Sequence, residues 1–219
     1  LSPWMQKLPG GLIHVNVVGC ALFAAISGSS AATVATVGKM SIPELRKRKY
    51  PEKILLGSLA GSGTLGLLIP PSIILIIYGV AVQESIAKLF IAGIIPGIMI
   101  ALIFMSYVII WSLINKKDMP KIIEEYSFLE KIKRSKQLLP VIILISAVIG
   151  SIYTGIATAT EAASLGVVGA LILSYFQKSL NLETFKSSLL GATKTSCMIA
   201  FILAGSTFLS LAMGFTGLP

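Results

Sequence analysis

The chain alternates long apolar runs with short charged segments, and the first apolar run predicts an unusual element. Residues 8–37 include no charged side chain and a single histidine, His14. As one helix this run would be about 45 Å long at about 1.5 Å per residue, against a hydrocarbon core of about 30 Å. A patch of serine and glycine at residues 27–30 divides the run into two shorter arms. We therefore expect residues 1–38 to form a re-entrant helical hairpin with its tip at this patch; one tilted helix with a small-residue packing face is the alternative.

A basic segment and a second, interrupted apolar run follow. Residues 39–53 have six basic and two acidic side chains, a net charge of +4, which is typical of a cytoplasmic loop. The run at residues 54–82 is interrupted by a glycine-rich stretch at 61–66 and by the pair Pro70 and Pro71. Because proline lacks an amide donor and its ring clashes with the preceding turn, this run predicts a broken transmembrane helix. The alternative is a plain kink, in which adjacent helices or water satisfy the freed carbonyl groups.

The rest of the pattern predicts one more helix, a connector and three further membrane spans. Residues 83–115 predict a transmembrane helix, and residues 139–219 three more. Residues 116–138 have apolar positions at roughly helical spacing among charged ones, which favours an amphipathic connector helix at the cytoplasmic membrane surface, or else a solvated connector. Thr158 and Glu161 match the capping-box pattern, so Glu161 is expected to cap a helix; the alternative is a functional acid near the membrane.

Composition places the chain among polytopic, all-α integral membrane proteins. Hydrophobic residues make up 55% of the chain and charged residues 12%, with a mean hydropathy of +0.89. The net charge of +9 is concentrated in short loops between apolar runs, so we expect contact with the lipid bilayer and no nucleic-acid partner. Cys20 and Cys197 stand in apolar runs and indicate neither a disulfide framework nor a metal site. The first residues lack a starting methionine and the basic region of a signal peptide, so we expect a piece of a longer protein.

The candidate catalytic patterns are weak, and we expect that the protein is not an enzyme. Gly61, Gly63 and Gly66 match G-x-G-x-x-G, but they lie inside an apolar run with no strand before them, which argues against a dinucleotide fold. His14 has no acidic residue in its run, which leaves little basis for a catalytic triad or a histidine-based metal centre. An intramembrane serine protease using a hydroxyl of residues 27–30 would need a base from a distant segment.

Four motifs together resemble the large membrane subunit of tripartite ATP-independent periplasmic (TRAP) transporters. They are LPGGL at residues 8–12, FAAISGSSA at 23–31, GTLGLLIPPS at 63–72 followed by Tyr78 and Gly79, and TATEAA at 158–163. The resemblance covers nearly the whole chain in the same order. One departure is Ala159, where the family usually has proline between the two threonines; this loosens the start of the helix and leaves the cap intact.

The resemblance implies a secondary importer of organic acids that is driven by sodium. It implies a fold of two inverted repeats, of which this chain covers part, with a transport domain that moves against a scaffold in an elevator-like way. It also implies a periplasmic substrate-binding protein and a small membrane subunit as partners, and a place in the bacterial inner membrane. C4-dicarboxylates, sialic acids and related sugar acids are the expected substrates.

The same resemblance assigns roles to residues of the two interrupted runs. The expected substrate-binding residues are Ser27, Ser29, Ser30 and Thr33. The expected sodium site lies between the hairpin tip and the broken segment, at Ser27, Gly28, Ser29, Gly61, Gly63, Thr64 and Ser72, whereas Pro70, Pro71, Thr158 and Glu161 have structural roles. Physical chemistry supports the pairing, since sodium prefers the carbonyl and hydroxyl oxygens that broken helices supply, and helix N-termini attract carboxylates.

Two other functions stay open at this point. The first is a membrane scaffold without transport activity, whose glycine, serine and proline residues serve only helix packing. The second is a related ion transporter that works without a periplasmic binding protein.

Overall fold

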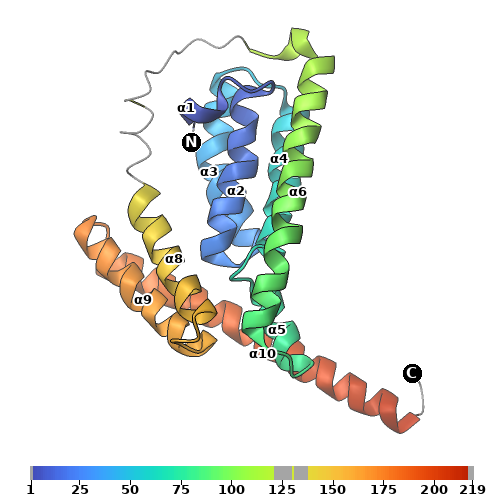
Figure 1. The fold of residues 1–219 in the computed structure, drawn as a ribbon, viewed down its shortest axis with the longest axis vertical. Coiled ribbons are helices and arrows are strands. Elements are labelled where there is room, and N and C mark those ends of the chain that lie inside the picture. Colours follow the sequence, from blue (N-terminus) through green and yellow to red (C-terminus); the bar gives the residue numbers. More distant parts are fainter. Residues whose placement is uncertain (1, 121–129, 131–137, 217–219) are drawn as a thin grey trace. The chain divides into compact units, whose positions relative to one another are not determined.

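The computed structural model of the chain describes residues 2–120, 130 and 138–216, and every regular element in these ranges is helical (Figure 1). The chain divides into two units, residues 1–166 and 167–219. The first unit contains α1 (Ser2–Met5), α2 (His14–Ser27), α3 (Ser30–Lys47), α4 (Glu52–Gly63), α5 (Ile73–Ala81), α6 (Ile86–Ile114) and α8 (Leu139–Tyr153), with short 3-10 helices η1 (Gly11–Ile13), η2 (Thr64–Leu67) and η3 (Lys116–Asp118). Helix α9 (Ala159–Phe176) begins in the first unit and continues into the second, which also contains α10 (Leu182–Thr216).

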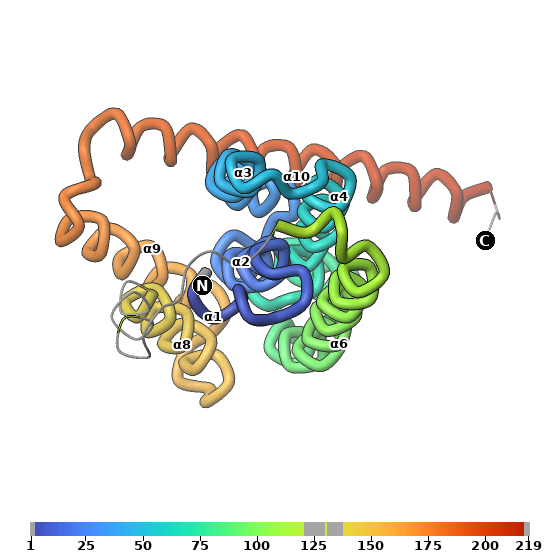
Figure 2. The backbone as a smooth tube through the Cα atoms, turned by 90° about the horizontal axis from the view of Figure 1, so that it is seen from above, coloured from blue at the N-terminus to red at the C-terminus, as the bar shows by residue number. Residues whose placement is uncertain are grey.

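A bundle of four helices forms the centre of the first unit. Helix α2 contacts α3, α4 and α6, and α4 also contacts α3 and α6. Figure 2, a view along the bundle, shows α2 flanked by these three helices. The buried apolar side chains at these contacts form several small clusters along the bundle: Leu12, Leu45 and Leu55; Ile13, Ile54 and Val108; Cys20, Val37 and Leu59; and Val17, Ala24 and Leu65. The bundle therefore buries one face of each helix, and large apolar side chains such as Met40, Leu56 and Leu102 are left exposed on the outward faces.

The first apolar run contains two helices, and the second of them extends beyond the end of the run. Helix α2 ends at Ser27 and α3 begins at Ser30, so the break lies in the serine and glycine patch. Helix α3 then continues to Lys47, through most of the segment expected to be the first basic loop, and only residues 48–51 separate it from α4. Lysine, arginine, leucine and glutamate are good helix formers, so a high charge density marks contact with water and not the end of a helix.

The second apolar run is interrupted in the part of the chain that contains the glycines and prolines. Helix α4 ends at Gly63 and continues as the short 3-10 helix η2, and α5 begins only at Ile73. Residues 68–72 have no helical assignment, and the peptide bond between Pro70 and Pro71 is cis.

A further apolar cluster within the first unit joins α6, α8 and the start of α9. Phe90, Ile152 and Ala162 are buried together, with Leu75 of α5 and Val148 of α8 packed against them. Much of the predicted amphipathic connector at residues 116–138 lies outside the described residues; the described part consists of η3 and the residues next to it.

Among the described residues, three helices are long and apolar enough to cross a membrane: α6, α9 and α10. Helix α8 is apolar and shorter, as is the segment Gly11–Ser27 that includes α2. Within the second unit, no described side chain of α10 is buried. Apolar surfaces of this extent are typical of helices that lipid or other protein segments cover.

Candidate functional site

The first helix break is built by Gly28 and Ser29. Gly28 has φ 59° and ψ 10°, in the left-handed region, and its N–H donates to the Ala24 carbonyl (2.9 Å). This is the conformation in which glycine commonly ends a helix, because it has no Cβ. Ser29 is extended and caps α3, with its Oγ accepting from the Ala32 N–H (3.4 Å). Two residues thus end one helix and start the next.

The hydroxyl groups at this break form one hydrogen-bonded cluster around the Ser29 carbonyl. The Thr33 N–H and the Thr33 hydroxyl both donate to the Ser29 carbonyl oxygen, at 3.0 and 2.7 Å. The Ser27 Oγ lies 2.9 Å from the Thr33 Oγ1 and 3.3 Å from the same carbonyl oxygen. Thr33 is fully buried, while Ser27, Ser29 and Ser30 are half-buried. The structure therefore places the four residues expected to bind substrate in one small region at the start of α3.

The second helix break satisfies part of its own backbone. The Ser72 hydroxyl, fully buried, donates to the Leu67 carbonyl oxygen (2.7 Å), and the Thr64 hydroxyl donates to the Gly61 carbonyl oxygen (2.7 Å). Pro70 and Pro71 have no N–H to donate, so the carbonyl groups before them need such partners.

The two breaks lie against each other, main chain to main chain. The Ile73 N–H donates to the Gly28 carbonyl oxygen (3.2 Å), and a Cβ on Gly28 would lie 2.8 Å from the Pro71 carbonyl oxygen. A Cβ on Gly66 would lie 2.9 Å from both the Ser29 carbonyl carbon and the Ser30 nitrogen. Backbone can approach this closely only where glycine stands, so Gly28 and Gly66 set the distance between the breaks.

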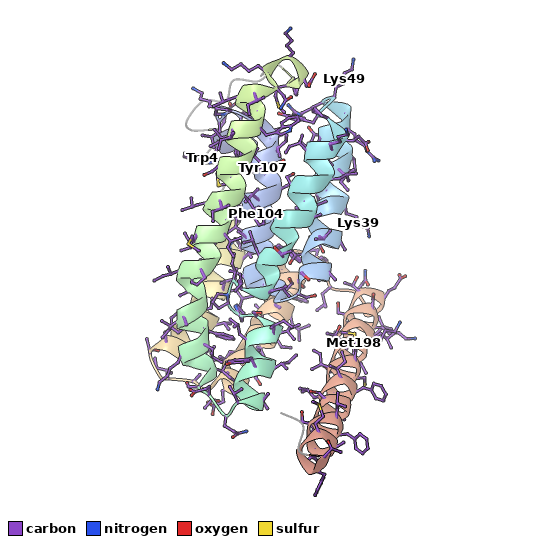
Figure 3. The ribbon with its side chains drawn as sticks, turned by 90° about the vertical axis from the view of Figure 1, so that its right-hand side faces the viewer. Trp4, Lys39, Lys49, Phe104, Tyr107 and Met198 are labelled. Atoms are coloured by element: carbon purple, nitrogen blue, oxygen red, sulfur yellow. The ribbon has the colours of Figure 1, made fainter. Side chains whose placement is uncertain are left out.

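The structure divides the residues expected at the sodium site into two groups. Gly63 lies against α3: a Cβ there would collide with the Val34 side chain and lie 3.8 Å from the Ser30 carbonyl oxygen. Gly61 instead packs on α6, where a Cβ would lie 3.2 Å from Phe104, a residue that Figure 3 shows on that helix. Thr64 is exposed and bonded within its own turn. The residues that meet at the junction are thus Ser27, Gly28, Ser29, Gly63 and Ser72.

Sequence reasoning assigned no site role to Gly66. It was noted only as the third glycine of a G-x-G-x-x-G pattern and as part of a family motif. A glycine between a broken helix and a proline pair is nevertheless a signal for close backbone approach, and that is the role the structure gives it.

A buried polar contact that the sequence analysis also missed fixes α4 against α2. The Asn16 Nδ2 donates to the Leu55 carbonyl oxygen (3.2 Å) and to the Ser58 Oγ (3.0 Å), and all three polar groups are buried. One turn further along α4, the Ser62 hydroxyl donates to the Ser58 carbonyl oxygen (2.6 Å). Asn16 has the one carboxamide side chain in residues 8–37, and such a polar group in an apolar run was the available sign of a buried hydrogen bond. This contact sets the register of the two helices that lead to the breaks.

The remaining predicted structural pair lies at the start of α9. The Thr158 N–H and the Thr158 hydroxyl donate to the Glu161 Oε2, both at 2.8 Å, and the Glu161 N–H donates to the Thr158 Oγ1 (3.3 Å). These are the reciprocal bonds of a capping box, and they occupy the Glu161 carboxylate with its own helix.

The donor set at the two breaks consists of hydroxyl and carbonyl oxygens. Among the described residues, no group of three or more His, Cys, Asp or Glu side chains is placed to hold a metal ion. Hydroxyl and carbonyl oxygens are ligands of hard cations, whereas transition metals favour nitrogen and sulfur. Hydroxyl groups can also donate to an anionic oxygen, together with the free N–H groups of a helix N-terminus.

Comparison with known proteins identifies the family. A family model described as "Tripartite ATP-independent periplasmic transporter, DctM component" matches residues 5–219. The chain belongs to this family. The sequence resemblance to the large permease subunit of TRAP transporters is thereby confirmed.

Individual relatives in the TRAP family are permeases, not enzymes. The chain is 37% identical over 90% of its length to the large permease protein of a C4-dicarboxylate TRAP transporter from Pseudomonas aeruginosa, of which it covers 46%. It is 35% identical over 96% of its length to the corresponding protein of Rhodobacter capsulatus, of which it covers 50%. It is 35% identical over 91% of its length to the sialic acid TRAP transporter permease protein of Haemophilus influenzae, of which it covers 32%. The chain thus spans about half the length of the first two of these relatives, and about a third of the last.

Proposed function

We propose that this chain is part of the large permease subunit of a sodium-coupled secondary importer for an organic acid. The observation that carries the proposal is the backbone-to-backbone packing of two helix breaks inside apolar segments of a TRAP-family chain. Irregular backbone at membrane depth occurs where it lines a cavity or is buried in protein, and broken helices in secondary transporters surround substrate and ion sites.

In this proposal, α2 and α3 form a re-entrant hairpin whose tip lies near the middle of the bilayer. The fold belongs to the inverted-repeat, elevator type, in which helices α2 to α5 are part of the moving transport domain. Both arms are short enough for this, since α2 has 14 residues and α3 has 18, several of them in the charged end beyond Gly38. The membrane is the bacterial inner membrane, and the net positive end of the bundle faces the cytoplasm.

The substrate is an organic acid whose carboxylate binds at the start of α3. The hydroxyl groups of Ser27, Ser29, Ser30 and Thr33 lie there, and the first amides of α3 and its helix dipole favour a negative group. Relatives named for C4-dicarboxylates and a relative named for sialic acid are nearly equally identical in sequence to this chain. Sequence identity therefore does not indicate which acid is the substrate.

The coupling sodium ion binds where the two breaks meet. The proposed ligands are oxygens of Ser27, Gly28, Ser29, Gly63 and Ser72, with Gly61 and Thr64 at the edge of the site. The Gly28 carbonyl oxygen accepts one hydrogen bond, from the Ile73 N–H, and a carbonyl oxygen has two lone pairs, so this oxygen can also coordinate a cation. The periplasmic binding protein would deliver the substrate, and a small membrane subunit would complete the complex.

The test is uptake by the full-length permease with its small subunit in proteoliposomes, with the periplasmic binding protein added outside. The probes are a radiolabelled C4-dicarboxylate and radiolabelled sialic acid. An inward sodium gradient should drive accumulation of one probe, and an equal potassium gradient should not. Equal accumulation with both cations would refute sodium coupling. Full uptake without the binding protein would place the chain with transporters that work without a periplasmic binding protein. If a folded complex took up none of the tested acids, this would favour a membrane scaffold without transport activity.

A further inference from the structure

A second polar pocket lies far from the helix breaks, at the end of the first unit where α3 ends and α4 begins. Its volume is about 240 Å³. It lies between the residues that precede α2, the loop that joins α3 to α4, and the C-terminal end of α6. Its polar lining includes Gln6, Tyr50, Ser112 and Lys116, and Gly11 lies beside Tyr50. Leu8, Leu113 and Met119 supply apolar surface.

Gln6 and Ser112 line this pocket, and their side chains make no hydrogen bond among the described residues. Gln6 is 6% exposed and Ser112 is 4% exposed. Neither polar group is fully enclosed, so both are free to bond a ligand that enters the cavity. On α6 the Ser112 hydroxyl would be free to turn toward such a ligand.

Tyr50 adds a third donor, and the backbone around it is shaped to admit its hydroxyl. The Leu12 N–H donates to the Tyr50 oxygen (3.1 Å), which leaves the phenolic proton for another partner. A Cβ on Gly11 would lie 2.5 Å from that oxygen, and Gly11 has φ 52°, so glycine is required beside it. Burial raises the pKa of the Tyr50 phenol, so it stays protonated and able to donate near neutral pH.

The charged side chain that lines the pocket is basic. It is Lys116, and no acidic residue lines the pocket among the residues that the structure describes. The same end of the bundle, marked by Lys49 in Figure 3, holds Lys7, Arg46, Lys47, Arg48, Lys53 and Lys117. The described acidic residues there are Glu44 and Glu52, which pair with Arg48 and Arg46, and Asp118. Among the described residues at this end, eight basic against three acidic side chains leave an excess of five positive charges.

We propose that this pocket binds the phosphate group of an anionic phospholipid of the cytoplasmic leaflet. The lining residues include an amide, two hydroxyl groups and an ammonium group, all of which can donate to the acceptor oxygens of a phosphate. Basic pockets between helices on the cytoplasmic side are recognition sites for lipid headgroups, and the apolar residues at this pocket suit the adjoining glycerol and acyl carbons. The inference does not depend on the transported substrate or on sodium.

The test is lipid binding by the purified full-length permease in detergent, measured by native mass spectrometry. The probes are phosphatidylglycerol, zwitterionic phosphatidylcholine and inorganic phosphate. We expect retained phosphatidylglycerol well above phosphatidylcholine. Competition by millimolar inorganic phosphate would show that the phosphate group is what binds, and phosphate binding with no preference for phosphatidylglycerol would overturn the lipid assignment.

Two pairs of variants assign the binding to this pocket. Lys116→Gln should lower the affinity for phosphatidylglycerol about five-fold, which is the effect of one lysine close to a lipid phosphate. Lys117→Gln, which lies outside the pocket lining, should lower this affinity less than about two-fold. Ser112→Leu should fill the cavity and reduce binding without changing charge, while Ser106→Leu, exposed on the same helix, should not. Thermal unfolding of each variant without added lipid checks the fold. Equal losses within either pair, in folded proteins, would overturn the proposal.

Discussion

At the scale of single residues, glycine determines how closely the two helix breaks approach. Gly28 is needed for its left-handed backbone and for the nearby Pro71 carbonyl, and Gly66 is needed only for space, since its φ is not positive. Space and conformation are separate requirements, and Gly66 allows the first to be tested alone.

Gly66→Ala should disturb the junction of the two breaks. Its Cβ would lie 2.9 Å from main-chain atoms of Ser29 and Ser30, and main chain cannot move aside as a flexible side chain can. We expect destabilisation of about 1–3 kcal/mol, the usual cost of overpacking, with loss of most uptake. Gly57→Ala is the matched control, because nothing lies within 4 Å of a Cβ there and alanine favours the helix. Thermal unfolding and uptake measure both, and equal behaviour of the two variants would contradict the close approach.

Thr33→Val should separate binding from packing at the hydroxyl cluster. Valine keeps the shape of the buried side chain and removes the hydroxyl that lies next to Ser27, while the Thr33 N–H still bonds the Ser29 carbonyl. We expect a rise in the substrate concentration for half-maximal uptake of about five- to ten-fold, the equivalent of about one hydrogen bond. Thr36→Val, half-buried on the same helix, should leave uptake unchanged. Loss of uptake that only follows loss of folded protein would instead indicate a packing role.

At the scale of elements, the contact of Asn16 with α4 explains why two local breaks come to lie together. The Asn16 side chain bonds one main-chain and one side-chain oxygen of α4, and its own Oδ1 has no partner among the described residues. A buried amide of this kind allows few alternative registers, because a shift of α4 by one residue would leave its donors unsatisfied.

A double-mutant cycle on Asn16 and Ser58 should measure this coupling. Asn16→Leu alone should destabilise the protein by about 1–3 kcal/mol, since it leaves buried partners with fewer bonds. Ser58→Ala should cost less, and the double variant should be more stable than the sum of the two single changes predicts, by at least about 0.5 kcal/mol. The free energies come from unfolding of the purified protein in detergent. Additive effects would show that the Asn16 to Ser58 hydrogen bond does not hold the two helices.

The local parts of this fold could be predicted from the residues themselves, whereas a site between the two breaks was expected only from the family resemblance. Gly28 and the pair Pro70 and Pro71 break helices through their own backbone properties, so the positions of the breaks were visible. The approach of Gly66 to Ser29 and the bond from Asn16 to Ser58 depend on which helices pack together, which no single segment encodes. The basic segment after the first apolar run was expected to be a loop, but most of it belongs to α3. Charge indicates exposure to water and says little about where a helix ends.

At the scale of the whole molecule, the charges and apolar surfaces indicate how the chain meets a membrane. The excess of basic side chains lies at one end of the first unit, and α6 joins that end to the loop at residues 82–85. The outward faces of α6 are apolar along its length, with Ile95, Leu102 and Ile110 more than half exposed. Such a surface is suited to lipid, and the basic end is the one that the proposed topology places at the cytoplasmic interface.

Cysteine labelling in spheroplasts tests this arrangement and the hairpin together. If α2 and α3 are the arms of one re-entrant hairpin, residues before α2 and after α3 lie on the same side, so Lys7→Cys and Lys49→Cys should both resist a membrane-impermeant maleimide added outside. Gln83→Cys, exposed in the loop before α6, should react from outside. The full-length permease with Cys20 and Cys197 replaced by alanine is the background, and labelling after detergent treatment shows that each new cysteine is reactive. A single tilted helix would place Lys7 and Lys49 on opposite sides, so labelling of one but not the other from outside would exclude the hairpin and the sodium site built on it.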